Sequence, residues 1–325
     1  MSRLRTSIAL ATYQSARYLE EQLESFQNQT RLPDEVVISD DHSTDGTHLI
    51  VELFRQRASF PVRFIKNNGP RGIGKNFENA VRHCSGDIIL FSDHDDVWLP
   101  AHVERLAGFL ELHDRVLAVS SNSYVVDEQL RHLGCTHEES VRYPRRLHEA
   151  LMRFPKHQFA LIVRYRLLSG HGLAFRSSLY PLILPFSDAC IHDWWVGMLA
   201  ASAGLVGYIS EPLTLYRTHS GQTMGGEKKS MVATAAGLAA KGGDESDVWR
   251  LILERLRERP EFAEDFEFSE RLLREKLEFI ECRSRTRKLS LPHRMVATSR
   301  ELLTGRYHRL GRGLFTFARD LYGDR

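Results

Sequence analysis

Three closely spaced aspartates end an apolar run in this sequence, and their spacing points most directly to chemistry. Residues 88–91 are Ile-Ile-Leu-Phe, and Asp93, Asp95 and Asp96 follow. An unbroken apolar run is typical of a strand buried on both faces of a mostly parallel sheet, and ligands bind at the carboxyl edge of such sheets. Because Mg²⁺ and Mn²⁺ prefer carboxylate oxygens and bridge to substrate phosphates, the spacing favours a divalent-metal site. The alternative is a solvated turn that caps the helix predicted for residues 99–112.

A second pair of acids, Asp40 and Asp41, ends another apolar run at residues 36–38. If both runs are strands of one parallel sheet, the two acidic segments face one crevice, which suits a metal together with a hydrogen-bonding ligand. The alternative is an Asx turn, in which the carboxylates accept hydrogen bonds from the backbone that follows them.

A glycine-rich segment, residues 69–76, lies between the two acidic segments and reads Gly-Pro-Arg-Gly-Ile-Gly-Lys-Asn. It has the spacing of a phosphate-binding P-loop, but that motif needs Ser or Thr after the lysine to hold Mg²⁺, and Asn76 stands there. We therefore interpret the segment as a glycine loop beside a ligand, with Arg71 or Lys75 available to a phosphate.

The second half of the chain carries two further candidates, Asp193 and His219. Asp193 precedes Trp194 and Trp195 at the start of an apolar segment, and two tryptophans after an acid are unusual on a mere surface. The alternative is that Asp193 caps a helix while the tryptophans fill the core. A lone histidine such as His219 is more often structural than functional.

Alternating strands and helices must position these residues. The links between them are short, as in right-handed βαβ units, so the sequence predicts an α/β fold with a mostly parallel sheet. The periodicity predicts strands at residues 8–10, 36–38, 62–65, 87–91 and 206–209, a long β-prone stretch at 117–126, helices at 17–27, 47–57 and 75–84, and loop with short helix at 141–158.

Length and composition bound the class of protein. The chain has 325 residues, 42% of them hydrophobic, and a formal net charge of +2, which is too small to indicate nucleic acid as the main partner. Its four cysteines are isolated from one another, so we expect a reduced, cytoplasmic setting. The longest uncharged run, residues 194–210, contains glycines and falls short of the about 20 apolar residues that span a bilayer, so no transmembrane helix is expected.

The sequence changes character near its end. Residues 226–244 are rich in Gly, Ala and Lys, which is typical of a flexible linker or a lid. From residue 245 the leucine spacing predicts amphipathic helices, and residues 283–325 carry 11 Lys or Arg against 3 Asp or Glu, a net charge of +8. Basic amphipathic helices of this kind can lie on an anionic membrane surface. The alternative is a set of helices that packs its Leu and Phe on the rest of the chain or on a second subunit, giving a homo-oligomer.

Taken together, these motifs resemble the family 2 glycosyltransferases, enzymes of the GT-A fold that use nucleotide-diphospho-sugar donors. No single motif is decisive, but their order and spacing are specific across about residues 5–225. The resemblance implies a GT-A fold, a Rossmann-like, mixed and mostly parallel sheet flanked by helices, with a C-terminal helical extension. Together with the composition of the tail, it divides the chain into a catalytic domain at 1–225, a linker or lid at 226–244 and the extension at 245–325. The matching stretches are residues 7–13, 18–23, 38–47, 68–77, 85–98, 170–175, 192–195 and 216–219.

The resemblance also implies a donor site at the carboxyl edge of the sheet. Ala11 and Tyr13 would line the nucleobase pocket. Asp41 would accept a hydrogen bond from a pyrimidine ring N–H, and Arg71 would approach the base or a phosphate. His94, the middle residue of the family's DxD motif in this chain, would belong to the same donor site.

The metal and the catalytic base follow from the same resemblance. Asp93 would meet the ribose or the metal, and Asp95 would bind the metal that bridges the diphosphate. His219 matches the histidine that completes the metal site in many GT-A enzymes. Asp193 matches the catalytic base, and His192 stands where many members have another acid.

The implied reaction is inverting sugar transfer that depends on Mg²⁺ or Mn²⁺. A base on the face opposite the leaving group requires a single displacement. The opening residues and residues 92–98 look most like bacterial rhamnosyltransferases of O-antigen and capsule assembly, so the implied donor is a pyrimidine nucleotide such as dTDP-rhamnose. The acceptor would be a hydroxyl of a surface glycan or a polyprenyl-linked intermediate, with the protein in the cytoplasm or peripheral at the inner face of the membrane.

Two other functions stay open at this point. The first is a non-catalytic nucleotide-sugar-binding scaffold of a glycan assembly complex, against which the presence of Asp193 argues. The second is a P-loop phosphotransferase or NTPase, against which Asn76 argues.

Overall fold

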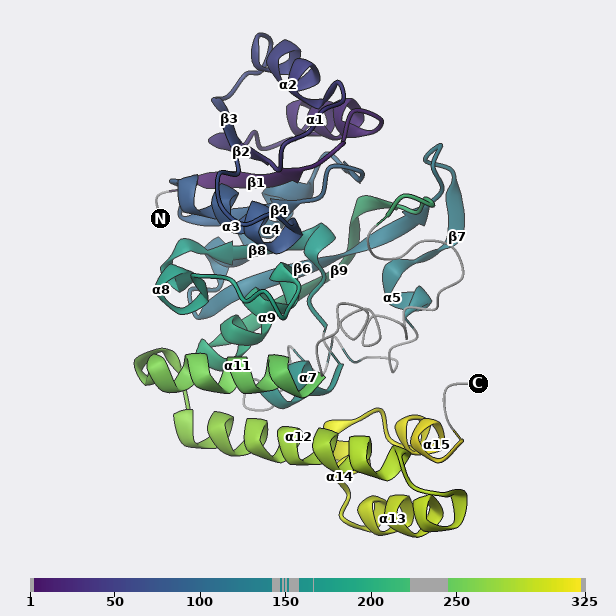
Figure 1. Ribbon diagram of the computed structural model, residues 1–325. Helices are drawn as coiled ribbons and strands as arrows, with labels where there is room; N and C mark the ends of the chain where they lie inside the picture. Colours follow the sequence, from purple (N-terminus) through teal and green to yellow (C-terminus); the bar gives the residue numbers. More distant parts are fainter. Residues whose placement is uncertain are drawn as a thin grey trace.

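A mixed sheet with helices on both faces forms the body of the molecule (Figure 1). The computed structural model describes residues 3–141, 147, 149, 151, 158–165, 167–222 and 245–322. Within these residues the strands pair in the order β3-β2-β1-β4-β8-β6-β9-β5, and β7 pairs with β6. The strands are β1 Thr6–Thr12, β2 Glu35–Asp40, β3 Val62–Lys66, β4 Ile88–Ser92, β5 Val97–Trp98, β6 Val116–Val126, β7 His132–Thr136, β8 Leu173–Arg176 and β9 Leu205–Arg217.

Four helices of the first half connect or cover the strands, and five helices follow one another at the end of the chain. The α-helices of the described ranges are α1 Leu19–Gln27, α2 Thr47–Arg55, α3 Ile73–His83, α4 His102–Leu112, α5 His137–Ser140, α7 Gln158–Tyr165, α8 Tyr180–Ile183, α9 His192–Ala203, α11 Glu245–Glu258, α12 Phe266–Arg287, α13 Leu291–Leu303, α14 Arg306–Leu310 and α15 Leu314–Tyr322.

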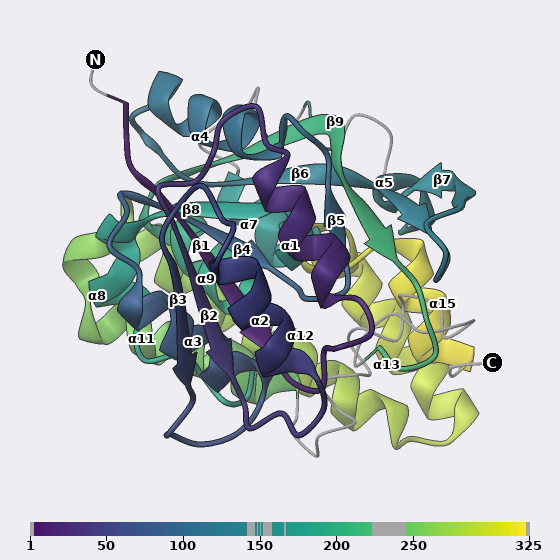
Figure 2. The same ribbon diagram turned by 90° about the horizontal axis from the view of Figure 1, so that it is seen from above.

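The predicted βαβ pattern of the first half is confirmed. Strand β1 pairs in parallel with both β2 and β4, and β2 pairs in parallel with β3. Figure 2 shows β1, β2 and β3 running side by side. Strand β8 is antiparallel to both β4 and β6, which makes the sheet mixed. The carboxyl ends of the parallel strands therefore share one edge, where ligands bind in such folds.

The apolar run of β4 is explained by two cores, one on each face of the sheet. Ile88 and Leu90 join the core formed with α1, α2 and α4, whereas Ile89 and Phe91 join the core formed with α3 and α9. Successive side chains of a strand point to opposite faces, so only an unbroken apolar sequence can fill both cores.

One strand is much longer than the sequence predicted. The prediction ended it at residue 209, but β9 continues through Pro212 to Arg217 beside β6. Two shifts of register flank Asn122 of β6, which pairs with Pro212. The irregularity lets the strand pass a proline that cannot donate a ladder hydrogen bond, and the strand then delivers its last residues to the site edge.

The C-terminal helices share the core of the sheet domain. Trp194 of α9 packs edge-on against Trp249 of α11, with ring centroids 5.3 Å apart, and Leu273 of α12 belongs to the same core. The Trp195 indole N–H donates to the Ile183 carbonyl at 2.7 Å. Both tryptophans of α9 are thus buried, as the structural alternative expected.

Some predictions cannot be compared with the structure. The linker predicted at 226–244 lies outside the described residues, as does most of the loop and short helix predicted at 141–158. Within the described residues, no helix combines the length and the apolar character that a membrane span requires.

Candidate functional site

The acidic segment after β4 meets the segment after β9. The antiparallel pairing of β5 with β9 brings these two segments together. The Oδ2 atom of Asp95 and the Nε2 atom of His219 lie 3.0 Å apart, although the residues are 124 positions apart in the chain. Both side chains are nearly buried. The structure therefore joins two of the three residues for which the sequence predicted metal binding.

The third residue, Asp93, does not complete a three-ligand cluster. The described residues contain no group of three or more His, Cys, Asp or Glu side chains that could hold a metal ion. Burial, and then the charges of Asp95 and Asp193, raise the pKa of Asp93 to about 8. Like carboxylates repel one another, so Asp93 stays within electrostatic reach of both acids without joining the Asp95–His219 contact.

A third acid of the segment adds another buried carboxyl group. Asp96 is 1% exposed, and its Oδ1 accepts the Arg217 backbone N–H at 3.1 Å, whereas its Oδ2 has no partner within the described chain. Burial, then Asp95 and Asp93, raise the pKa of Asp96 well above its usual range. This donor set fits a divalent cation, with Asp95 and His219 as protein ligands and substrate oxygens as the others.

His94 and Ala11 lie at the same edge. Ala11 is buried near the carboxyl end of β1. Burial lowers the pKa of His94, although Asp95 and the backbone of Ala11 act in the opposite direction. The ring of His94 is therefore neutral at pH 7 and can accept or donate a hydrogen bond there.

The two acids after β2 have different surroundings. Asp40 accepts from the Ser43 backbone N–H, three residues on, at 2.8 Å and from two hydroxyls, so its carboxylate is held within the turn that follows β2. Asp41 instead accepts from the Gly72 N–H at 2.9 Å and from the Asn67 side chain at 3.1 Å. The Asp41 carboxylate thus ties the glycine loop to the end of β2, and each oxygen keeps a lone pair for a ligand.

The glycine loop leaves one of its two cations exposed. Lys75 donates to the Phe186 carbonyl at 2.8 Å and pairs with Glu78 at 3.1 Å, so it is held by the fold. Arg71 is exposed. Tyr13, at the end of β1, has 55% of its surface exposed. Of the ring and the two cations that the sequence predicted near a base or phosphate, Tyr13 and Arg71 are therefore accessible.

Asn76 explains why the P-loop resemblance is only superficial. Its side-chain amide donates to the Thr12 carbonyl at 2.9 Å, and the residue is 2% exposed. The position that would hold Mg²⁺ in a P-loop therefore faces the end of β1 and stabilises the fold.

Asp193 lies in the first turn of α9, where backbone groups hold its carboxylate. Its Oδ2 accepts the Gly170 N–H at 2.8 Å and its Oδ1 accepts the Trp194 N–H at 2.6 Å. A Cβ atom on Gly170 would meet Oδ2 at 3.0 Å, so glycine permits this close approach. Burial raises the pKa of Asp193, although both N–H groups act in the opposite direction.

His192 does not take the part of a second acid. Its ring stacks on Phe77 with centroids 3.8 Å apart, and neither ring nitrogen has a partner within the described residues. Burial lowers its pKa to about 3. His192 is therefore a neutral aromatic group of the core, and Asp193 is the acid of the pair whose charge reaches Asp93.

The sequence reasoning passed over Arg217, which is 1% exposed. Its Nε donates to the Asp95 carbonyl at 2.7 Å, its Nη2 pairs with Glu21, and its guanidinium lies 4.5 Å from the Tyr18 ring centre. That same ring lies 4.8 Å from the ring of His219. Arg217 therefore fixes the backbone of Asp95 and, through Tyr18, the surroundings of His219. Arg217 could have been predicted from its place in the Tyr-Arg-Thr-His segment, two residues before His219.

Tyr216 is the second residue that sequence reasoning missed. Burial, followed by the charges of Asp96, Asp93, Asp95 and Asp193, raises its pKa. The phenol therefore keeps its proton and can donate a hydrogen bond toward the acids or toward a substrate oxygen.

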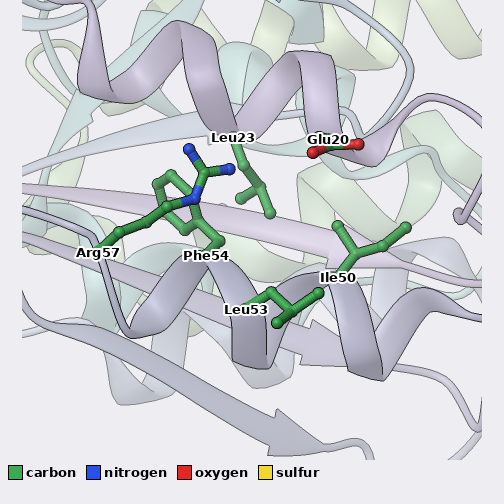
Figure 3. A pocket seen from close by; sticks show the side chains of 6 residues that line it. All are labelled: Glu20, Leu23, Ile50, Leu53, Phe54 and Arg57. Carbon is green, nitrogen blue, oxygen red and sulfur yellow. The ribbon is translucent and has the colours of Figure 1, made fainter.

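A small hollow between α1 and α2 lies elsewhere on the molecule (Figure 3). Its space is about 60 Å³, and its lining is mainly Leu23, Ile50, Leu53 and Phe54, with Glu20 and Arg57 at the rim. Ligand pockets for drug-sized molecules are several times larger, so the hollow is too small for a nucleotide sugar.

Comparison with protein families and relatives gives a consistent result. The family model described as "Glycosyl transferase family 2" matches residues 7–180. The abequosyltransferase RfbV of Salmonella typhimurium is 33% identical over 32% of this chain and 32% of its own. The dTDP-rhamnosyl transferase RfbG of Shigella flexneri is 26% identical over 66% of this chain and 73% of its own. The chain spans 45%, 65% and 32% of three curated relatives that it matches.

Solved structures show the same architecture. S. aureus TarS 1-349, crystallised in complex with UDP-GlcNAc, superposes with a TM-score of 0.57 at 21% identity over 90% of this chain and 79% of that one. The mannosyltransferase PcManGT from Pyrobaculum calidifontis, in complex with GDP-Man and Mn²⁺, superposes with a TM-score of 0.52 at 18% identity over 100% and 89%. At these identities the similarity shows the fold, which is GT-A.

Proposed function

Since this chain belongs to glycosyl transferase family 2, we propose that it transfers a sugar, with inversion, from a nucleotide diphosphate to an acceptor hydroxyl. One observation carries the proposal. The Asp193 carboxylate is held by two backbone N–H groups, at 2.8 Å and 2.6 Å, within electrostatic reach of Asp93 in the acidic segment. A fixed acid beside a donor set suited to a metal diphosphate is the arrangement that this reaction needs.

Asp193 acts as the general base in this proposal. An acceptor hydroxyl bound beside its carboxylate loses its proton to Asp193 while the hydroxyl oxygen forms the new bond to the anomeric carbon. The bond from that carbon to the diphosphate breaks on the opposite face, so the anomeric configuration inverts. Burial raises the pKa of Asp193, which makes its ionised carboxylate a stronger proton acceptor.

The leaving diphosphate departs toward Asp95 and His219. Mg²⁺ or Mn²⁺ held by these two residues would neutralise the charge that develops on the diphosphate. Tyr216 adds a neutral hydroxyl at this edge. The Mn²⁺ in the PcManGT complex supports a divalent cation for this fold.

The donor is a pyrimidine nucleotide sugar, with dTDP-rhamnose as the first candidate. Tyr13 and Ala11 line the base, Asp41 accepts from the ring N–H, His94 contacts the nucleotide sugar and Arg71 reaches the base or a phosphate. The similarity to RfbG, a dTDP-rhamnosyl transferase, and the UDP-GlcNAc complex of TarS support a pyrimidine base.

The acceptor is a hydroxyl of a growing surface glycan or of a lipid-linked intermediate, and the reaction takes place on the cytoplasmic side of the membrane. The poly(ribitol-phosphate) acceptor in the name of the TarS glycosyltransferase supports a growing surface polymer as this class of acceptor. In this proposal residues 1–225 are the catalytic domain, 226–244 a linker or lid, and 245–325 a helical extension.

Ligand stabilisation of the purified protein tests the donor site. We expect dTDP and UDP to raise the melting temperature when Mn²⁺ is present, and ADP to raise it little, since a ligand that binds only the folded state stabilises it. The Asp193→Asn variant should keep this stabilisation and lose transfer to a glycan acceptor. Indifference of the wild type to every nucleotide would overturn the proposal, and so would an active Asp193→Asn variant.

A further inference from the structure

The C-terminal helices have an inner face that packs and an outer face that does not. On the inner face, Tyr307 and Leu310 of α14 are buried against Phe279 of α12. Leu321 of α15 is also buried. The alternative in which these helices pack on the rest of the chain is therefore right for part of their apolar residues, and the remainder needs a separate explanation.

The outer face concentrates exposed apolar side chains. Of the thirteen large hydrophobic residues that are strongly exposed in the described chain, eight lie between residues 289 and 322. Neighbouring helices α13 and α15 carry most of them, and Figure 1 shows α13 at the end of the molecule furthest from β3. We define the distal surface as six of these residues, each more than half exposed: Leu291, Met295, Val296, Leu314, Phe315 and Tyr322.

Spacing within α13 shows that this exposure is not scattered. Leu291 and Met295 are four residues apart and share one side of the helix, and Val296, the residue after Met295, lies about 100° further round it. Their exposed fractions are 53%, 52% and 53%. A soluble helix normally buries such a stripe against a core, so a stripe left outside marks an interaction surface.

Part of the positive charge around the distal surface is not used by the fold. Arg283 and Arg287 pair with Asp320, and Arg309 pairs with Glu275. Three other cations, Arg285, Lys288 and Arg300, are exposed, and no carboxylate of the described chain lies within ion-pair distance of them. They leave a net positive field on the C-terminal helices.

We propose that the distal surface, together with Arg285, Lys288 and Arg300, docks on an anionic bilayer surface. The apolar side chains enter the boundary between headgroups and acyl chains, and the three cations face acidic headgroups. A second copy of this chain fits less well, because it would bring the same positive surface against itself. The inference concerns binding alone and stands independently of the proposed sugar transfer.

Vesicle sedimentation tests the proposal with the whole chain. We expect binding to vesicles of phosphatidylcholine with phosphatidylglycerol, weak binding to phosphatidylcholine alone, and loss of binding at 1 M salt, where the Debye length is about 3 Å. The variant Met295→Ser with Phe315→Ser should lower the partition coefficient about tenfold or more, because two apolar side chains no longer enter the boundary.

The matched control carries the same chemical change on another helix. Leu49→Ser with Leu53→Ser alters two residues of α2 that are 55% and 54% exposed, close to the 52% and 53% of the test pair. This control should bind vesicles as the wild type does. In the charge arm, Lys288→Gln with Arg300→Gln should lower binding to anionic vesicles about fivefold per charge.

Four outcomes would overturn the proposal. These are a wild type that stays in the supernatant with anionic vesicles, equal loss in the α2 control, binding that ignores lipid charge, and a concentration-dependent dimer in gel filtration that the Met295→Ser, Phe315→Ser variant abolishes. Nucleotide stabilisation of the same samples separates this result from the proposed function, since the distal-surface variants should still be stabilised by dTDP with Mn²⁺.

Discussion

Two regions of this molecule that bury aspartates differ in how the carboxyl charge is balanced. Asp320 of α15 is fully buried, and Arg283, Arg287 and the Tyr307 hydroxyl all donate to it. Burial alone would raise the pKa of Asp320, but the two arginines lower it below its usual range. A carboxylate so compensated holds the C-terminal helices together.

Asp93 and Asp96, at the carboxyl edge of the sheet, lack a cationic partner of this kind among the described residues, whereas Asp95 has His219. Arg217 lies beside them, yet its guanidinium donates to backbone carbonyls and pairs with Glu21, and only its backbone N–H reaches Asp96. The pKa of Asp93 is raised to about 8 as a result of burial and like charge. With this pKa Asp93 is mostly protonated at pH 7, and a bound cation would favour its ionised form, so these acids mark a candidate ligand site.

The largest effect should come from the acid that the proposal makes a base. We expect Asp193→Asn to lower kcat by about 10²- to 10⁴-fold, because the amide cannot take the acceptor proton. The melting temperature should change little, since relief of a buried carboxylate with a raised pKa offsets the loss of one of the two N–H contacts. Steady-state kinetics and thermal unfolding check both parts, with the exposed Asp114→Asn as the control. A variant that loses stability together with activity would erase the contrast with Asp320.

Asp320→Asn should show the opposite pattern. It leaves two arginines without their buried counter-charge and should lower the free energy of unfolding by about 3 kcal/mol or more. Activity per folded molecule should stay close to that of the wild type. Urea denaturation measures the change.

Asp247→Asn is the matched control for this prediction, because it breaks an exposed ion pair with Arg250 on the same group of helices. Its cost should be within about 1 kcal/mol. If Asp320→Asn itself unfolds, Arg287→Gln supplies the milder test, since that side chain is 39% exposed. A loss no larger than that of the control would contradict the assignment of Asp320 as a structural charge.

Removal of single acids from the sheet edge should show which of them binds the metal. We expect Asp95→Asn to weaken Mn²⁺ binding in the presence of dTDP by more than about 100-fold. Loss of a residue that only supports a metal ligand costs about 10- to 100-fold, and loss of the ligand itself should cost more. Asp40→Asn, which alters the acid held in the turn after β2, should leave the Mn²⁺ affinity nearly unchanged. Electron paramagnetic resonance of free Mn²⁺ gives the affinity, and equal affinities for the two variants would contradict the proposed ligand.

Lowering the pH should abolish the activity that depends on Asp193 before it removes the stability that depends on Asp320. The pKa of Asp193 is raised above 3.8, so kcat should fall about tenfold per pH unit below that raised value as the base becomes protonated. The pKa of Asp320 is lowered, so its contribution to stability is complete above 3.8 and is lost only as the pH falls through the lower folded value. Activity should therefore disappear at a pH where the C-terminal helices are still folded, as circular dichroism would show. Coincident losses would contradict this order.

The parts of the molecule that could be predicted from sequence are those fixed by local pattern. The first four strands follow from apolar runs, and the acids after β2 and β4 from their place at strand ends. The register shift that carries β9 past Pro212 depends on the partner strand β6, so the sequence reading ended that strand too early. The same holds for the Gly170 contact of Asp193 and for the paired Asp320, each of which is decided by residues distant in the chain.

The smallest effect should come from the partner that occupies Arg217. Glu21 pairs with Arg217 but is 54% exposed, so Glu21→Gln should cost no more than about 1 kcal/mol, which is about fivefold in an equilibrium constant. We expect this cost to appear as weaker Mn²⁺ binding with little change in melting temperature, because Arg217 fixes the Asp95 backbone beside the proposed metal site. Glu20→Gln, one residue away on α1, should change neither quantity. If Mn²⁺ affinity instead rises in Glu21→Gln, the freed guanidinium does not compete with the cation. The hydrogen bond from Arg217 to the Asp95 carbonyl would then not be needed to position Asp95 for the metal.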